Sequence, residues 1–116
     1  MKLKQVSALL KARVICGKEL LEKRAEHVFC TDVMADVLAF SEPDAVLITR
    51  LHDLSVVRSC LMADIPCVVL SDGILPSPEF ISLAEAQELV VMTVPGSMFR
   101  AVEILLEAGL NEADWS

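Results

Sequence analysis

Three short apolar runs recur at regular intervals along the chain. They span Ala45–Thr49, Cys67–Ser71 and Leu89–Thr93, and each ends in a hydroxyl residue that lies 22 residues from the next. Apolar residues are continuous rather than alternating within each run, which is typical of strands covered on both faces, as in parallel sheets. The interval suits a compact unit of strand, helix and loops with a right-handed crossover.

Helix-capping residues separate these runs. Helices are predicted from Asp53 or Ser55 to about Ala63, from Ser77 with Pro78 behind it, and from Ser97 to Gly109. In each case a side chain that can accept hydrogen bonds from free backbone amides precedes the helical stretch. This part of the chain is therefore predicted to consist of successive β-α units.

The N-terminal part adds two helices and two strands. Leu3, Val6, Leu9 and Leu10 mark an amphipathic helix, Arg13–Cys16 is a short strand of undetermined direction, and a strand at His27–Thr31 leads into a helix over Asp32–Phe40 that Asp32 caps. The predicted fold class is α/β, a three-layer α/β/α domain with a mainly parallel sheet of four to five strands. Residues 1–110 form this single domain, and residues 111–116 form a tail without periodicity.

The predicted helix over Asp32–Phe40 has an unusually wide apolar surface. Its apolar side chains are spread around most of its circumference and belong to Val33, Met34, Val37, Leu38 and Phe40. Contact with a sheet covers only one side of a helix, so a second cover is expected. That cover is either another protein chain, which makes these residues the candidate interface of a homodimer, or the N-terminal helix of the same chain.

Composition and charge narrow the choice of partners. The length of 116 residues fits one domain, but an apolar fraction of 54% and a mean hydropathy of +0.56 are high for this size, so contact with another protein is expected. A net charge of −7 without a cluster of Lys and Arg argues against a nucleic-acid partner. No apolar run is long enough to span a membrane, and a cytoplasmic protein is expected.

The ends of the predicted strands supply candidate ligand-binding residues. Thr31, Thr49, Ser71 and Thr93 would share the carboxyl edge of a parallel sheet, where open α/β folds bind their ligands. In the alternative interpretation, these hydroxyls only bond the first backbone amides of the turns that follow. The sequence leaves both interpretations open.

Two loops extend this candidate site. Asp72 and Gly73 form a turn that could contact a ribose or an amine, and Gly96 with Ser97 marks a helix start without a carboxylate, where an anion could bind. Each feature also has a purely structural interpretation, as a tight turn in the first case and as a helix cap in the second.

Motifs of several catalytic classes are absent from the sequence. It contains neither G-x-G-x-x-G nor G-x-x-x-x-G-K-[ST], which excludes a dinucleotide fingerprint and a P-loop kinase. The four cysteines form no C-x-x-C pair and are expected in the core. His27 and Cys30 would point to opposite faces of a strand, so neither a metal nor a cofactor is predicted. His52 and Asp53 could form an acid–base pair or merely cap a loop, and no catalytic residue is assigned.

Two long segments resemble the DRTGG domain family. They are VLITRLHDLSVVRSCLMADIPCVVLSDGILPSPEFISLA and TVPGSMFRAVEILLEAGL, and CTDVMADVLAF is similar to the family's entry into its first β-α unit. Such domains occur alone, or beside CBS pairs in pyrophosphatases and in some phosphotransacetylases, and are similar in fold to the N-terminal domain of HPr kinase/phosphorylase. The resemblance implies a non-catalytic, dimer-forming regulatory module.

The resemblance has one clear departure. Where relatives carry a glycine pair and the charged residues that name the family, this chain has Arg50, Leu51, His52 and Asp53. Side chains here fill a loop where bare backbone could have approached a ligand. Taken together, the residues and the resemblance predict a non-catalytic regulatory or scaffolding domain that forms a homodimer or docks on an enzyme partner. The alternative is a sensor of a nucleotide or other small metabolite at the carboxyl edge of the sheet.

Overall fold

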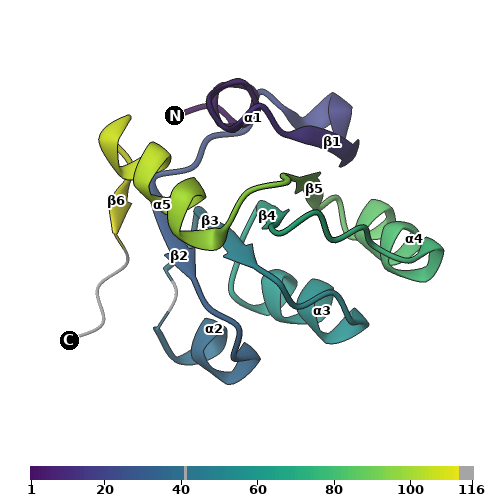
Figure 1. Cartoon of the computed structure of the whole chain (residues 1–116). Coiled ribbons are helices and arrows are strands. Elements are labelled where there is room, and N and C mark those ends of the chain that lie inside the picture. The colour runs from purple at the N-terminus through teal and green to yellow at the C-terminus, as the bar shows by residue number, and fades with distance from the viewer. Residues whose placement is uncertain (41, 113–116) are drawn as a thin grey trace.

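A six-stranded sheet lies between two layers of helices (Figure 1). The computed structural model describes residues 1–40 and 42–112, and the strand order in the sheet is β1-β5-β4-β3-β2-β6. The strands are β1 (Arg13–Cys16), β2 (His27–Cys30), β3 (Ala45–Thr49), β4 (Cys67–Leu70), β5 (Val90–Thr93) and β6 (Asn111–Glu112). All neighbouring pairs are parallel except β1 and β5, which are antiparallel. The predicted fold class is confirmed, with one strand more than expected.

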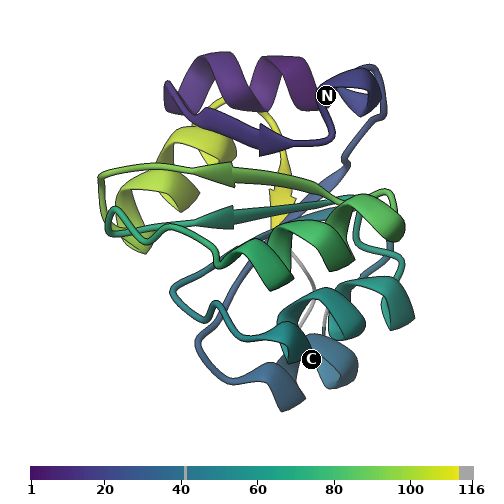
Figure 2. The same cartoon turned by 90° about the vertical axis from the view of Figure 1, so that its right-hand side faces the viewer.

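The helices divide between the two faces of the sheet (Figure 2). They are α1 (Leu3–Leu10), α2 (Met34–Phe40), α3 (Leu54–Met62), α4 (Pro78–Ala86) and α5 (Met98–Glu107), and a 3-10 turn, η1 (Lys18–Leu20), follows β1. The apolar residues of α2, α3 and α4 form a core on one face, and those of α1 and α5 form a core on the other. None of the helices in the described part of the chain is long and apolar enough to cross a bilayer.

The middle strands contribute to both cores because successive side chains point to opposite faces. In β3, for example, Leu47 belongs to the core under α2, α3 and α4, whereas Val46 and Ile48 belong to the core under α1 and α5. Every residue of β3, β4 and β5 is buried. This burial explains why these segments are continuously apolar in the sequence.

The hydroxyl residues that end the apolar runs are equally spaced in the sequence, but the strand register does not place them all in one row of the sheet. Thr49 pairs with Leu70, and Leu70 pairs with Thr93. Ser71 therefore lies one residue beyond the row that contains Thr49 and Thr93, and alternation along a strand would turn its side chain to the other face. The register therefore separates by 21 and 23 residues the strand positions that the sequence spacing had placed 22 residues apart.

Three of the four predicted helix caps are confirmed. Asp53, Ser77 and Ser97 cap α3, α4 and α5, and each side chain accepts a hydrogen bond from a backbone amide of the first turn. The prediction that Asp32 caps the helix after β2 is wrong. That helix begins at Met34, and the Asp32 carboxylate instead accepts hydrogen bonds from Arg50.

Helix α2 obtains its second cover from α3, not from the N-terminal helix, which packs against α5 on the other face. Val37 is completely buried in the core of its own chain, with an exposed fraction of 0%, and Met34 packs against the same core. Val37 is therefore not available as an interface residue. Val33 and Leu38 remain exposed, and the side chain of Phe40 lies outside the described residues.

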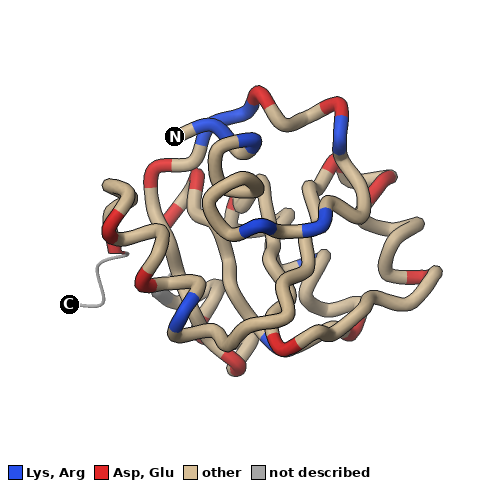
Figure 3. Tube along the Cα trace, turned by 45° about the horizontal axis from the view of Figure 1, so that its top comes forward, with Lys and Arg blue, Asp and Glu red and all other residues tan. Residues whose placement is uncertain are grey.

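Basic residues gather in the N-terminal layer (Figure 3). Seven of the ten lie before β2: Lys2, Lys4, Lys11, Arg13, Lys18, Lys23 and Arg24. The expectation that the chain has no cluster of Lys and Arg is therefore wrong for this segment. The expected tail also begins differently, because Asn111 and Glu112 pair with β2 as the edge strand β6.

Gly17, directly after β1, occupies a position that excludes larger residues. Its φ is +87°, and a Cβ atom placed there would lie 2.9 Å from the Cα atom of Val90. We expect Gly17→Ala to lower the free energy of unfolding by about 2–4 kcal/mol, because left-handed strain adds to a clash with the backbone of β5.

Urea denaturation would measure this loss, with Gly73→Ala as the matched control. Gly73 has a φ of +71°, but no atom lies within 4 Å of an added Cβ, so only the conformational cost of about 1 kcal/mol is expected. Equal losses in the two variants would contradict the clash with β5.

Candidate functional site

The predicted row of hydroxyl residues lies at the carboxyl edge of the sheet. Thr93, Ser71, Thr49 and Thr31 follow one another along this edge, at the ends of β5, β4, β3 and β2. All four are buried. They are thus brought together, although their burial leaves little of them open to a ligand.

Two of the four hydroxyls hold the turns that follow them. The Thr31 hydroxyl accepts a hydrogen bond from the Val33 amide at 3.0 Å, and the Thr49 hydroxyl accepts one from the Leu51 amide at 3.1 Å. These contacts agree with the interpretation that the hydroxyls bond the first backbone amides of the turns that follow. The Thr93 hydroxyl has no hydrogen-bond partner within the described residues, but Thr93 is as buried as Thr31, with exposed fractions of 7% and 8%.

The two candidate loops are joined to each other by backbone hydrogen bonds. The Asp72 amide donates to the Gly96 carbonyl at 2.8 Å, and the Gly73 amide donates to the Val94 carbonyl at 3.0 Å. The Ser71 hydroxyl donates to the Asp72 carboxylate at 2.7 Å. The residues predicted in separate loops therefore form one continuous surface at the ends of β4 and β5.

A bidentate ion pair between Asp32 and Arg50 links the loops after β2 and β3. Arg50 donates from Nε and Nη2 to the Asp32 Oδ2 atom at 2.9 and 2.7 Å, and its amide donates to Oδ1 at 3.0 Å. Partial burial raises the pKa of the Asp32 carboxyl, but the hydrogen bonds and charge of Arg50 outweigh it, so this pKa lies below its ordinary value. The hydrogen bonds and charge of Asp32, with a smaller effect from the charge of Asp72, also raise the pKa of Arg50.

The residues considered for acid–base or metal chemistry do not come together. The His52 Nδ1 atom lies 3.2 Å from the Arg50 carbonyl oxygen, while Asp53 caps α3. Among residues 1–40 and 42–112, no three His, Cys, Asp or Glu side chains gather as metal ligands would.

The cysteines behave as core residues. Cys16, Cys60 and Cys67 are buried and Cys30 is half-buried, and all four are free thiols. Burial raises the pKa of the Cys60 thiol to about 12 and that of Cys67 further still. Thiols with such pKa values are poor nucleophiles near neutral pH, because the thiolate is the reactive form.

Several features of this edge were not predicted from the sequence. Phe99, in the first turn of α5, has an exposed fraction of 86%, and Leu75 is exposed in the loop before α4. The Asp32–Arg50 pair had a recognisable signal, because an acidic and a basic residue each follow a threonine at the ends of two consecutive strands. The exposure of Phe99 also had a signal in the sequence. The helical period places Phe99 on the side of α5 opposite Ala101 and Leu105, which are buried.

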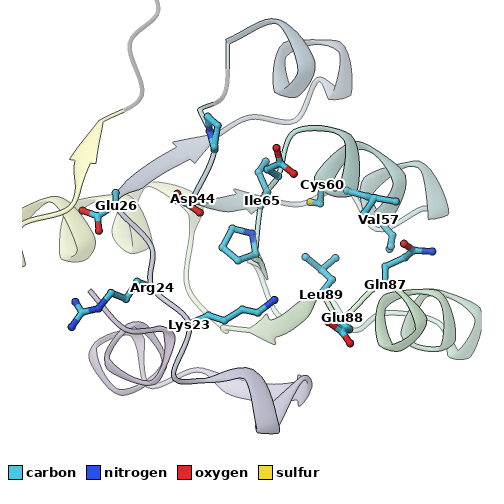
Figure 4. Close-up of a pocket in the computed structure, with 14 residues that line it drawn as sticks. Lys23, Arg24, Glu26, Asp44, Val57, Cys60, Ile65, Gln87, Glu88 and Leu89 are labelled. Atoms are coloured by element: carbon cyan, nitrogen blue, oxygen red, sulfur yellow. The ribbon is translucent and has the colours of Figure 1, made fainter.

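A further hollow lies at the opposite, amino edge of the sheet (Figure 4). It has a volume of about 680 Å³ and is lined by the connections that lead into β2, β3, β4 and β5. No sequence pattern pointed to it, because it is formed by residues that precede strands rather than follow them.

The pKa of the Asp32 carboxyl should depend on its ion pair with Arg50. We expect Arg50→Gln to raise the pKa of Asp32 toward the ordinary value of about 3.9, though not fully, because the amide of residue 50 still donates to the carboxylate. The pKa of Asp32 is lower in the folded chain than in the unfolded chain, so the pair stabilises the fold at pH values above the unfolded pKa. This stabilisation is lost as the pH falls through the folded pKa.

Carboxyl ¹³C NMR titration would measure this pKa in both proteins. Arg58→Gln is the control, because Arg58 is an exposed arginine of α3 without an ion pair in the described part of the chain. An unchanged Asp32 pKa in Arg50→Gln would show that the guanidinium does not hold the carboxylate in solution.

Comparison with known proteins agrees with this fold. The model of the DRTGG domain family matches residues 5–108, and the comparison with curated proteins gave no match. A similar solved structure comprises the CBS and DRTGG domains of the regulatory region of Clostridium perfringens pyrophosphatase, complexed with the activator diadenosine tetraphosphate. The TM-score is 0.72 and the sequence identity is 18%. The match covers 94% of this chain and 47% of the Clostridium perfringens chain, so this chain spans about half of that structure. Because the family model covers most of its length, the chain belongs to the DRTGG domain family.

Proposed function

We propose that this chain is a non-catalytic regulatory domain that acts by contact with another protein, in the first place a second copy of itself. The observation that carries the proposal is a group of exposed apolar side chains on two adjacent helices, Val33 before α2, Leu38 in α2 and Met62 at the end of α3. We call this group the α2–α3 face. Its most exposed member is Met62, with an exposed fraction of 71%.

The position of the α2–α3 face favours a symmetric contact. Helices α2 and α3 pack against each other on one side of the sheet and lie at the surface (Figure 1). Burial of one such side chain against a partner contributes about 1.5–3 kcal/mol, and a two-fold contact uses each residue twice. The same face could dock on an enzyme, as the similar domain in Clostridium perfringens belongs to the regulatory region of a pyrophosphatase.

Adjacent substitutions in α2 distinguish an interface from the core. We expect Leu38→Asp to weaken self-association without unfolding the domain, because Leu38 is exposed in the single chain. Val37→Asp should unfold it, since Val37 is completely buried and an unpaired buried charge costs several kcal/mol.

Sedimentation at high micromolar concentration would measure association, and circular dichroism would measure folding. Leu106→Asp is the matched control, because it places the same charge on an exposed leucine of α5, on the opposite face of the sheet, and is expected to leave association unchanged. A wild-type chain that is monomeric at every concentration would contradict the proposal of a homodimer.

A second candidate function is a nucleotide sensor at the carboxyl edge. Support comes from the exposed ring of Phe99, on which a base could stack, and from the guanidinium of Arg50 along the same edge. Backbone is open to a ligand at Gly73 and Gly96, where an added Cβ would meet nothing within 4 Å. The similar Clostridium perfringens structure holds diadenosine tetraphosphate, which makes this compound the first probe.

Thermal unfolding with diadenosine tetraphosphate tests the sensor. A concentration of one hundred times the dissociation constant would stabilise the wild-type domain by about 2.7 kcal/mol. We expect Phe99→Ala to lose most of this gain, whereas Leu106→Ala, a truncation of another exposed apolar residue of α5, should keep it. An unchanged melting temperature at millimolar probe would contradict binding at this edge.

Two further expectations accompany the proposal. The absence of catalysis stays a prediction, supported by thiols with raised pKa values and by a His52 that does not pair with Asp53. A cytoplasmic setting also stays a prediction, supported by four free cysteines, since reducing compartments keep thiols unpaired.

A further inference from the structure

The hollow at the amino edge has the size and floor of a small-molecule site. Its volume of about 680 Å³ lies within the range of roughly 300–1,000 Å³ that is usual for ligand pockets. Four buried apolar residues line it: Val57, Cys60, Ile65 and Leu89. These side chains come from α3 and from the connections into β4 and β5, so the floor belongs to the rigid core.

The rim of the hollow is predominantly acidic. Glu26, Asp44, Asp64 and Glu88 line it, and within the described residues none of them forms an ion pair. Only Lys23 and Arg24 supply positive charge to the lining. Four carboxylates against two cations leave the site net negative.

Helix ends add to this negative potential. Helices α3 and α4 both end beside the hollow, and neither has a basic residue in its last turn. The carboxyl end of a helix carries a partial negative charge from its unpaired carbonyl groups. Two such ends and the acidic rim therefore act in the same direction.

A metal ion does not fit this arrangement. The carboxylates are distributed around the rim rather than gathered, and no cluster of three potential metal ligands occurs among the described residues. Calcium and magnesium require several oxygen ligands around one point, and an apolar floor offers none. A cation with one charged end and an apolar remainder suits an acidic rim above an apolar floor better.

We propose that the hollow binds a small organic cation, an amine or guanidine carried on an apolar body. The charged group lies at the rim against Asp44 and Asp64, which are neighbours because the Asp44 amide donates to the Asp64 carbonyl at 3.1 Å, and the apolar body lies on the floor near Ile65 and Leu89. This assignment follows from charge complementarity at the rim and apolar complementarity at the floor. It is independent of the carboxyl edge and of the α2–α3 face, which share no residue with the hollow.

Lys23 occupies part of this site. Figure 4 shows its side chain extending across the hollow toward Leu89. Its ammonium group forms no ion pair within the described residues, so it offsets the rim charge without being held in place. An incoming cation has to compete with this ammonium group, and removal of Lys23 should therefore increase its affinity.

Titration with hexylammonium, followed by ¹H–¹⁵N NMR of the full chain, tests the proposal. We expect shifts to concentrate at residues 43–44, 64–66 and 87–89, which line the hollow. Hexanol has the same apolar body without charge, hexanoate carries the opposite charge, and propylammonium has the same charge on a shorter body. All three should bind more weakly than hexylammonium.

Variants of the rim provide the decisive comparison. The double variant Asp44→Asn/Asp64→Asn removes two charges and preserves the backbone, because both residues have positive φ values that asparagine adopts readily. We expect it to weaken hexylammonium binding by about three- to tenfold, as the loss of two exposed charge contacts would. Lys23→Gln should strengthen binding. Glu19→Gln/Glu107→Gln removes two exposed carboxylates elsewhere and should leave it unchanged.

Any of three positive results would overturn the proposal, and so would one negative result. They are equal binding of hexanol and hexylammonium, shifts located away from the hollow, and equal weakening by the rim and control double variants. The absence of any shift at tens of millimolar hexylammonium would overturn it as well. None of these results bears on self-association or on nucleotide binding, which are measured with other variants.

Discussion

The complete burial of β3, β4 and β5 on both faces is the constraint on which the rest of the structure depends. Each strand must pair its backbone groups with neighbours and also cover two rows of apolar side chains. A fully buried Val, Leu or Ile contributes roughly 1.5–3 kcal/mol, so loss of either helical layer would expose more apolar surface than a domain of this size can tolerate. Helices must therefore lie on both sides, and all connections are confined to the two edges of the sheet.

The two edges differ in chemistry because helices and strands run in opposite directions. Helix amino ends meet the carboxyl edge, where hydroxyl and carboxylate caps are required, and Asp53, Ser77 and Ser97 supply them. Helix carboxyl ends meet the amino edge, where the chain reverses through left-handed residues. Asp64 and Glu88 take these positions, with φ values of 57° each, in place of the glycine that would adopt them at lower cost.

Helix α2 shows how a single element can serve both core and surface. Its apolar circumference is divided between the core, which takes Val37, and solvent, which Leu38 faces. The width of its apolar surface correctly indicated a second cover, but α3 of the same chain provides that cover, which the sequence analysis did not consider. The remaining exposed residues form a smaller face than the whole helix would have offered. A partner that uses this face contacts α3 as well as α2.

Much of the fold could be predicted from the sequence, because burial of a strand on both faces and capping of a helix each require particular residues within the element itself. Strands β1 and β3 and the caps of α3, α4 and α5 were predicted at the observed residues. The direction of β1, the strand register and the pairing of β6 depend on how segments distant in the sequence meet, and no local pattern encodes them. The hydroxyl row could be predicted because each of its members ends a strand or directly follows one. The Asp32–Arg50 pair left a signal in the sequence, but its geometry depends on how the loops after β2 and β3 meet. The amino-edge hollow arises only when separate connections converge around the packed sheet, and so the tertiary structure alone decided it.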